Sequence, residues 1–178
     1  MTGSALLVRS EHVAGKLTDH FAPRTNVIRL SDAVFAQTSV AAVGVAAHEA
    51  GHAVQHAQNY LPNKIRGVLV PVANIGSKLS WILIMLGLIF YARIGTVLLY
   101  IGIILFSASV LFTVVTLPVE FDASRRALKC FRDTNLLAGD EYKGAKSVLQ
   151  AAAMTYVASA VTAIMQLLRL LLIARRRN

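Results

Sequence analysis

The sequence predicts a mainly helical integral membrane protein with a small polar part that includes a short β-strand or hairpin. The first observation is composition: 56% of the 178 residues are hydrophobic and only 15% are charged, against about 25% charged residues in a typical soluble domain. The second is a set of three long apolar runs, and the third is a polar stretch ahead of them. We therefore expect one membrane-embedded domain over residues 1–178.

The polar lead-in covers residues 1–40, and a helix is expected at about 40–58. Within the lead-in, "PRTNVIRLS" predicts a turn followed by a short strand, because proline and asparagine favour turns and Val27, Ile28 and Leu30 favour extended structure. The opening "MTGSALLVRS" is too short and too poor in apolar residues for a signal peptide. The next stretch is rich in alanine and valine and lacks proline until "NYLPNK" ends it.

Three apolar runs are candidate membrane spans, at about 68–91, 94–119 and 147–173. About 20 apolar residues cross a bilayer, and the middle run has no charged residue. "YARIG" joins the first two runs into a hairpin, Pro118 marks the end or a kink of the second, and "DASRRALKCF" predicts a separate helix. A buried core in a water-soluble protein is disfavoured, because these runs are too long for so small a core. The last run also fits a helix lying flat on the membrane, since Gln166 and Arg169 give it a polar edge.

The net charge of +9 is carried by basic residues that flank the apolar runs. Anionic lipid and cytoplasmic loops account for this placement, and the scarcity of aromatic residues beside them argues against nucleic acid as a partner. The side of the spans that holds the predicted helix at 40–58 has Lys64, Arg66, Arg125, Arg126, Lys129 and Arg132, whereas the hairpin tip has only Arg93. This bias places the polar part on the cytoplasmic side. The basic residues Arg175 to Arg177 fit this orientation only if the last apolar run does not fully cross the membrane.

The segment "HEAGH", His48 to His52, is an H-E-x-x-H motif within the predicted helix. Two histidines four residues apart share one helix face and can bind one Zn²⁺, while Glu49 can act as general base toward a water activated by the metal. Gly51 lets another element pack close to the helix. The single cysteine, Cys130, excludes a cysteine-based zinc cage and an intramolecular disulfide. Two buried histidines and a glutamate without a metal would carry a heavy desolvation cost.

A catalytic zinc site needs a third protein ligand. His56 lies eight residues after His48, a rise of about 12 Å along a helix, so we expect it at the surface or behind a ligand. The apolar hairpin returns the chain to the side of the histidines, and Glu120 is the first acidic residue after the return. A charge near the membrane needs a partner, and Zn²⁺ is one. The alternative is a salt bridge from Glu120 to Arg125 or Arg126.

Asp122 follows Glu120 by two residues and has two interpretations. It can orient a histidine from behind the ligands, or it can cap the N-terminus of a helix. Both stay open at this point.

With these residues in view, the chain resembles the YugP-type membrane zinc metallopeptidases of bacteria, the neutral zinc metallopeptidase family. The matching segments run from about Lys16 to Leu172 and are "LTDHFAPR", "VIRLS", "AAVGVAAHEAGHAVQHA", "LVPVANIGSKLSWILI", "TLPVEFDASRRAL" and "EYKGAKSVLQAAAMTYVA". The resemblance implies a zincin-like, specifically gluzincin, site with His48, His52 and Glu120 on zinc and Glu49 catalytic. Members of the family usually begin with a further apolar segment where "MTGSALLVRS" stands here, so the number and direction of the spans stay open.

The expected function is a zinc-dependent endopeptidase of the bacterial plasma membrane, with the bilayer and a peptide or membrane protein as partners. The strand in "NVIRLS" is a candidate for pairing with an extended substrate. Two other function classes stay open: a catalytically silent membrane adaptor that keeps the zincin fold, and a zinc hydrolase of a non-peptide amide or ester. The oligomeric state is not indicated.

Overall fold

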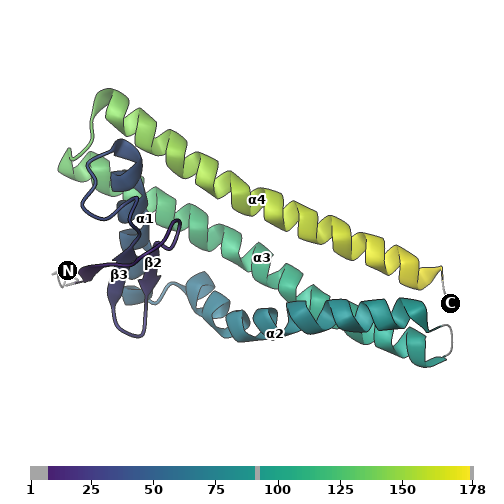
Figure 1. Ribbon diagram of the computed structural model, residues 1–178. Helices are drawn as coiled ribbons and strands as arrows, with labels where there is room; N and C mark the ends of the chain where they lie inside the picture. The colour runs from purple at the N-terminus through teal and green to yellow at the C-terminus, as the bar shows by residue number, and fades with distance from the viewer. Residues whose placement is uncertain (1–7, 91–92, 177–178) are drawn as a thin grey trace. The chain divides into compact units, whose positions relative to one another are not determined.

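The computed structural model describes residues 8–90 and 93–176 (Figure 1). Its elements in chain order are β1 (Arg9–His12), β2 (His20–Ala22), β3 (Val27–Leu30), α1 (Val40–Ala57), α2 (Leu61–Ile89), α3 (Arg93–Thr134) and α4 (Gly139–Arg175). The described chain is therefore mainly helical with a small sheet, as predicted. Most of the opening segment, the centre of the hairpin turn at Tyr91 and Ala92, and Arg177 lie outside the described residues.

The described residues form two compact units. The first contains residues 1–63 and 118–154, and the second contains residues 64–117 and 155–178. Both α3 and α4 contribute residues to each unit. All the residues singled out by the H-E-x-x-H argument belong to the first unit.

The sheet of the first unit has the order β1-β3-β2, with β1 parallel and β2 antiparallel to β3. The apolar side chains of β3 are buried because this strand lies at the centre, and Ile28 and Leu30 pack against residues of α1. The prediction of a strand at "NVIRLS" is confirmed. The idea that this strand binds substrate by pairing is wrong, because β3 already has a partner strand on each side.

Helix α1 begins and ends where the sequence predicts. The Ser39 hydroxyl oxygen accepts a hydrogen bond from the amide of Ala42 at 3.2 Å and caps the N-terminus. After Ala57, Asn59 has a left-handed φ of 55°, which ends the helix before α2 begins at Leu61. The histidines therefore lie on a helix with both ends defined by local sequence.

Two apolar clusters hold α1 in the first unit. One joins it to the sheet through Ala42, Val45, Ala46 and Ala50. The other joins it to the end of α3 and the start of α4 around the fully buried Phe131. Burial of apolar area on two sides of α1 fixes the direction of its remaining polar residues.

Helix α3 continues through Pro118 without a break. The predicted end of the helix at this proline, and the separate helix predicted for "DASRRALKCF", are therefore replaced by one helix of 42 residues. Pro118 removes one backbone donor, that to the Val114 carbonyl, and this single loss does not end the helix. Helix α4 likewise starts at Gly139, eight residues before the predicted apolar run.

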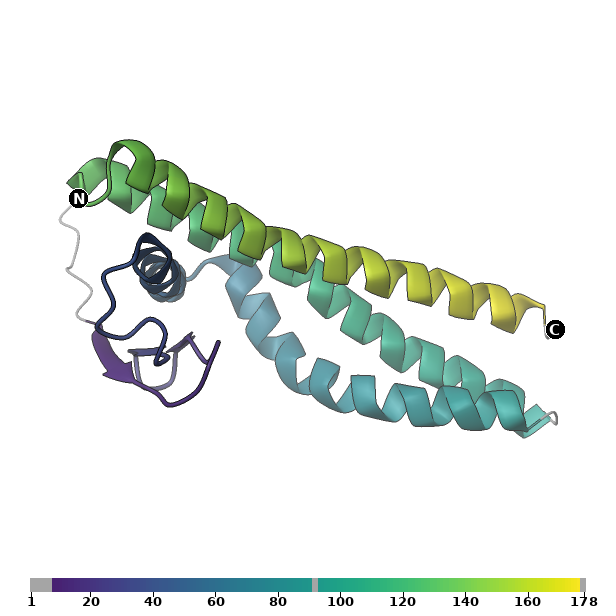
Figure 2. The same cartoon turned by 45° about the horizontal axis from the view of Figure 1, so that its top comes forward.

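In the second unit, α2 and the first part of α3 lie side by side as an antiparallel hairpin (Figures 1 and 2). Glycines allow this contact: a Cβ atom on Gly87 would lie 2.6 Å from the Leu99 backbone nitrogen. Three helices of the described chain, α2, α3 and α4, are long and apolar enough to cross a membrane. In their most apolar windows only 28%, 28% and 17% of the residues are buried within the protein, which leaves large apolar surfaces of the kind that lipid covers.

Candidate metal centre

His48 and His52 project from the same face of α1. Their ring centroids are 4.7 Å apart and the rings are nearly perpendicular, at 85°. This follows from the spacing of four residues, which is about one helical turn. Both side chains are largely shielded from solvent, with 15% and 11% of their area exposed.

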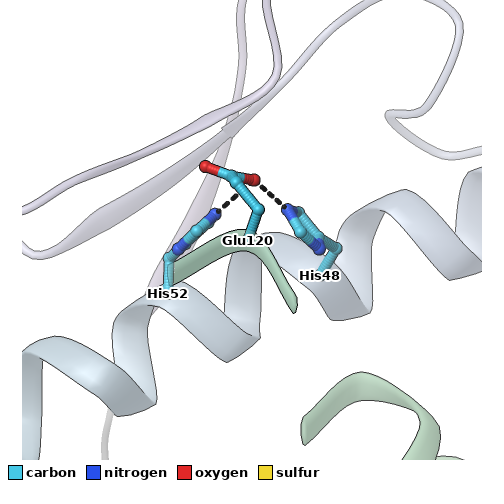
Figure 3. Close-up of side chains that lie close together, drawn as sticks. All are labelled: His48, His52 and Glu120. Atoms are coloured by element: carbon cyan, nitrogen blue, oxygen red, sulfur yellow. Dashed lines mark hydrogen bonds and ion pairs between the residues drawn. The ribbon is translucent and has the colours of Figure 1, made fainter. Parts of the chain in front are cut away.

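Glu120 of α3 places its carboxylate between the two imidazoles (Figure 3). Its Oε2 lies 3.2 Å from His48 Nε2 and 3.6 Å from His52 Nε2, and Glu120 is only 2% exposed. In the part of the chain that the structure describes, these three residues form a group whose candidate ligand atoms all lie within 4.8 Å of one another. The chain return inferred from the sequence thus brings Glu120 to the histidines.

The spacing of these atoms fits Zn²⁺. Zinc bonds of about 2.0–2.2 Å in a tetrahedron put neighbouring ligand atoms about 3.3–3.5 Å apart. The two separations from Glu120 Oε2, 3.2 and 3.6 Å, bracket this value. Two nitrogens and one oxygen are also the donor types of known three-ligand catalytic zinc sites.

The outward-facing nitrogens of both imidazoles also have partners. His48 Nδ1 lies 3.1 Å from the Ser124 hydroxyl, and His52 Nδ1 lies 3.0 Å from Gln55 Oε1. Such contacts orient metal-binding histidines and leave Nε2 for the metal. Neither residue was predicted from the sequence. The spacing in the sequence could have indicated both, because Gln55 is three residues after His52 and Ser124 is four after Glu120, which puts each on the same helix face as a proposed ligand.

Asp122 lies behind the cluster. On a helix, residues two apart differ by about 200° in direction, so Asp122 points away from Glu120. Its Oδ2 accepts hydrogen bonds from Gln55 Nε2 at 2.9 Å and from Arg126 Nε at 2.6 Å. Because Asp122 is in the interior of α3, the helix-cap interpretation is wrong. The residue reaches His52 only through Gln55.

Glu49 and His56 take different positions. Glu49 is 8% exposed, and its Oε2 accepts a hydrogen bond from the backbone amide of Phe21 at 2.9 Å. His56 is exposed, and its ring lies 5.7 Å from that of Phe21. His56 stands outside the group of possible ligands, as its rise along the helix implied.

Two opposing effects act on the pKa of His52. Burial lowers it by disfavouring the charged imidazolium, but the hydrogen bond and charge of Glu120, with further help from Glu49 and Gln55, outweigh burial. The net result is a pKa above the ordinary value of 6.5. A cation is therefore favoured beside Glu120, whether a proton on His52 or a metal ion.

The fold and this cluster define a class: a helical protein with membrane-length helices and an H-E-x-x-H histidine pair completed by a glutamate from a distant helix. The family described as "Putative neutral zinc metallopeptidase" matches residues 5–175, and the chain belongs to this family. A relative from Bacillus subtilis (strain 168), "Putative membrane protease YugP", is 42% identical over 164 residues, covering 92% of this chain and 71% of the relative. No solved structure gives a significant match.

Proposed function

We propose that this protein is a zinc-dependent membrane endopeptidase. The observation that carries the proposal is the meeting of His48, His52 and Glu120 at zinc-ligand spacing, although Glu120 lies 68 residues after His52 in the chain and on another helix. Such a meeting is costly without a cation, because it buries a carboxylate against two imidazoles. The family description supports the reaction class.

In this proposal His48 and His52 bind zinc through Nε2, and Glu120 binds it through a carboxylate oxygen. When bound, Zn²⁺ supplies Lewis-acid polarisation of the scissile carbonyl and activation of the attacking water. The exposed areas of 15% and 11% on the histidine side chains leave a route for water and substrate to the centre. These three residues would thus form a gluzincin-type ligand set.

Glu49 is proposed as the general base. Its carboxylate accepts the proton of the attacking water and then donates it to the leaving amine as the peptide bond breaks. The Phe21 amide holds Oε2 at 2.9 Å and so orients the carboxylate. A carboxylate next in sequence to a zinc-binding histidine is close enough for this transfer.

Strand β2, rather than β3, is proposed as the strand that binds an extended substrate. In an antiparallel pair the amide and carbonyl of one residue point the same way across the strand. The Phe21 amide points to Glu49 and not to β3, so the free edge of β2 faces the base. Because the Phe21 amide donates to Glu49, an extended peptide at this edge would pair through the Phe21 carbonyl and would lie beside the proposed zinc.

The site is proposed to face the cytoplasm, and its substrate to be a peptide or a membrane protein presented at the bilayer surface. The part of α3 that follows Glu120 carries four basic residues, Arg125, Arg126, Lys129 and Arg132, whereas the other end of α3 has Arg93. This is the bias expected when the end that carries the site is cytoplasmic.

The test uses purified full-length protein in detergent. Zinc per chain is measured, and cleavage of casein and of a membrane-protein substrate is compared between wild type and Glu49→Gln. The variant should keep zinc and lose about 10²–10⁴-fold in cleavage rate, the usual contribution of a positioned base. His56→Gln, on the exposed part of the same helix, is the matched control and should retain activity.

Two results would contradict the proposal: cleavage that survives in Glu49→Gln, or zinc-loaded wild type that cleaves neither substrate. The second result, with hydrolysis of a non-peptide amide or ester, would favour the other hydrolase class. Zinc binding without any hydrolysis would favour an adaptor.

A further inference from the structure

Gln55 is a fully buried side chain, 0% exposed, that contacts both helices of the metal centre. Its Oε1 lies 3.0 Å from His52 Nδ1. Its Nε2 lies 2.8 Å from the Val119 carbonyl oxygen and 2.9 Å from Asp122 Oδ2. One amide thus joins a proposed zinc ligand on α1 to the turn of α3 that carries Glu120.

The partners determine which way the amide points. The Val119 carbonyl and the Asp122 carboxylate are acceptors, so both require a donor, and only the NH₂ group of Gln55 can donate to both. Oε1 must then face His52 Nδ1. Since Oε1 only accepts, Nδ1 must carry a proton and donate it.

Asp122 is itself held in place by its ion pair with Arg126, at 2.6 Å between Oδ2 and Nε. The Arg126 Nη1 also donates to Gln58 Oε1 at 2.6 Å. A contact from Gln58, just past the end of α1, therefore helps to hold the Asp122 carboxylate that orients the Gln55 amide. Rotating the Gln55 amide by 180° would place its carbonyl oxygen against two acceptors, so the observed orientation is strongly preferred.

We propose that Gln55 is a positioning residue that holds neutral His52 in the Nδ1–H tautomer, with the lone pair of Nε2 directed at the metal position beside Glu120. The tautomer assignment stands on the Gln55 contacts at 2.8–3.0 Å. Glu120 Oε2 competes less for a proton on His52 Nε2, because it lies 3.6 Å from that atom and 3.2 Å from His48 Nε2. The use of this tautomer in binding zinc rests on the proposed function. His48 lacks this constraint, because the Ser124 hydroxyl 3.1 Å from its Nδ1 can donate or accept. The two histidines thus differ in how firmly their tautomers are set.

The experiment reads the tautomer without zinc or substrate. Zinc-free, ¹⁵N-histidine-labelled full-length protein in detergent is studied by two-bond ¹H–¹⁵N NMR at a pH where His52 is neutral, and His52→Gln assigns its signals. Wild type should show Nδ1–H for His52. A wild-type His52 protonated at Nε2 would overturn the proposal, even before any Gln55 variant is made.

Variants of Gln55 test the contact of its carbonyl oxygen and the contacts of its NH₂ group separately. Gln55→Leu removes all three contacts and should release His52 from the Nδ1–H form. Gln55→Glu keeps an acceptor for Nδ1–H but places a carboxylate against Val119 and Asp122, so it should keep the tautomer while weakening the tie to α3. Gln37→Leu, at an exposed position ahead of α1, is the control and should leave His52 unchanged.

Zinc affinity, measured by competition with a chelator, is the second readout. Gln55→Leu should bind zinc about 10–100-fold more weakly, the usual effect of losing a partner of a metal ligand. Gln55→Leu that keeps both the Nδ1–H form and wild-type zinc affinity would refute the proposal. Wild type with Nδ1–H at His52 but no hydrolase activity would refute only the proposed function.

Discussion

Gly51 of α1 lies directly against the backbone of Ala123 in α3: a Cβ atom on Gly51 would be 2.6 Å from the Ala123 carbonyl oxygen. Real Cβ atoms are essentially never that close to such an atom. Since Gly51 precedes His52 and Ala123 lies three residues after Glu120, this crossing sets the distance between the proposed ligands of the two helices.

Gly51→Ala should therefore push α1 and α3 apart. We expect a loss of stability of about 1–3 kcal/mol, as for other overpacked sites, and at least about a tenfold loss of zinc affinity, because losing a single partner of a ligand already costs that much. Thermal unfolding measures the loss of stability, and zinc per chain measures the loss of zinc binding. Gly67→Ala is the matched control, since nothing lies within 4 Å of its Cβ position. Equal behaviour of the two variants would show that the close crossing does not hold the site together.

Glu120→Gln should lower zinc affinity by more than about 100-fold, the upper range for losing a mere partner of a ligand. The charge is lost while the shape is kept. Asp122→Asn, by contrast, keeps an amide oxygen that can accept a hydrogen bond from Gln55, so its zinc affinity should fall much less. Zinc titration of both variants against a chelator gives the comparison. Unchanged zinc binding in Glu120→Gln would move the third ligand to another acidic residue.

The raised pKa of His52 predicts that the stability of the protein changes with pH in opposite directions with and without zinc. A pKa above 6.5 in the folded state means that protonated His52 stabilises the zinc-free protein below pH 6.5, and this contribution is lost as the pH rises through the folded pKa. Zinc needs the neutral imidazole, so zinc-bound protein should become more stable over the same rise. Melting temperatures of chelator-treated and zinc-loaded samples test this between about pH 6 and 8.

Glu120→Gln is the control for the pH prediction. It removes the carboxylate whose hydrogen bond and charge raise the pKa of His52. The variant's zinc-free melting temperature should show a weaker fall across that range. A wild-type, zinc-free protein that becomes more stable with rising pH would contradict the prediction.

Cys130 allows a direct test of the orientation. It is the chain's single cysteine, is exposed, and lies ten residues after Glu120 on α3. If the site is cytoplasmic, a membrane-impermeant maleimide should label Cys130 in lysed cells and not in intact ones. Arg93→Cys in a Cys130→Ser background, at the other end of α3, should show labelling in intact cells. The reverse pattern would place the site outside the cytoplasm.

Features set by local residue order were predictable. The spacing of His48 and His52 predicts one shared helix face, because helical geometry depends only on nearby residues. The bounds of α1 follow from a capping serine and a turn, and the membrane-length helices follow from apolar length. Even Glu120, far along the chain, could be inferred because a hairpin of two spans must return to its starting side.

Features set by partners distant in the sequence were not predictable. The strand at Val27–Leu30 was expected, but its central place follows from pairing with β1 and β2, which the strand's own residues do not specify. Pro118 was expected to end or kink a helix, and the helix continues past it because one lost hydrogen bond is small beside the contacts of the whole element. Ser124 and Gln55 became part of the site only through neighbours on the other helix.

The sequence by itself determined that this protein has membrane-length helices, an H-E-x-x-H helix and an acidic residue on the returning chain, because periodicity, length and order are local properties. Only the tertiary structure decided that α1 and α3 cross at Gly51 and Ala123, that Glu120 lies 3.2 Å from His48, and that Gln55 ties His52 to Val119 and Asp122. These depend on which surfaces pack together. Because the backbones of α1 and α3 pack closely, the H-E-x-x-H motif and the distant Glu120 carboxylate lie together in one candidate site.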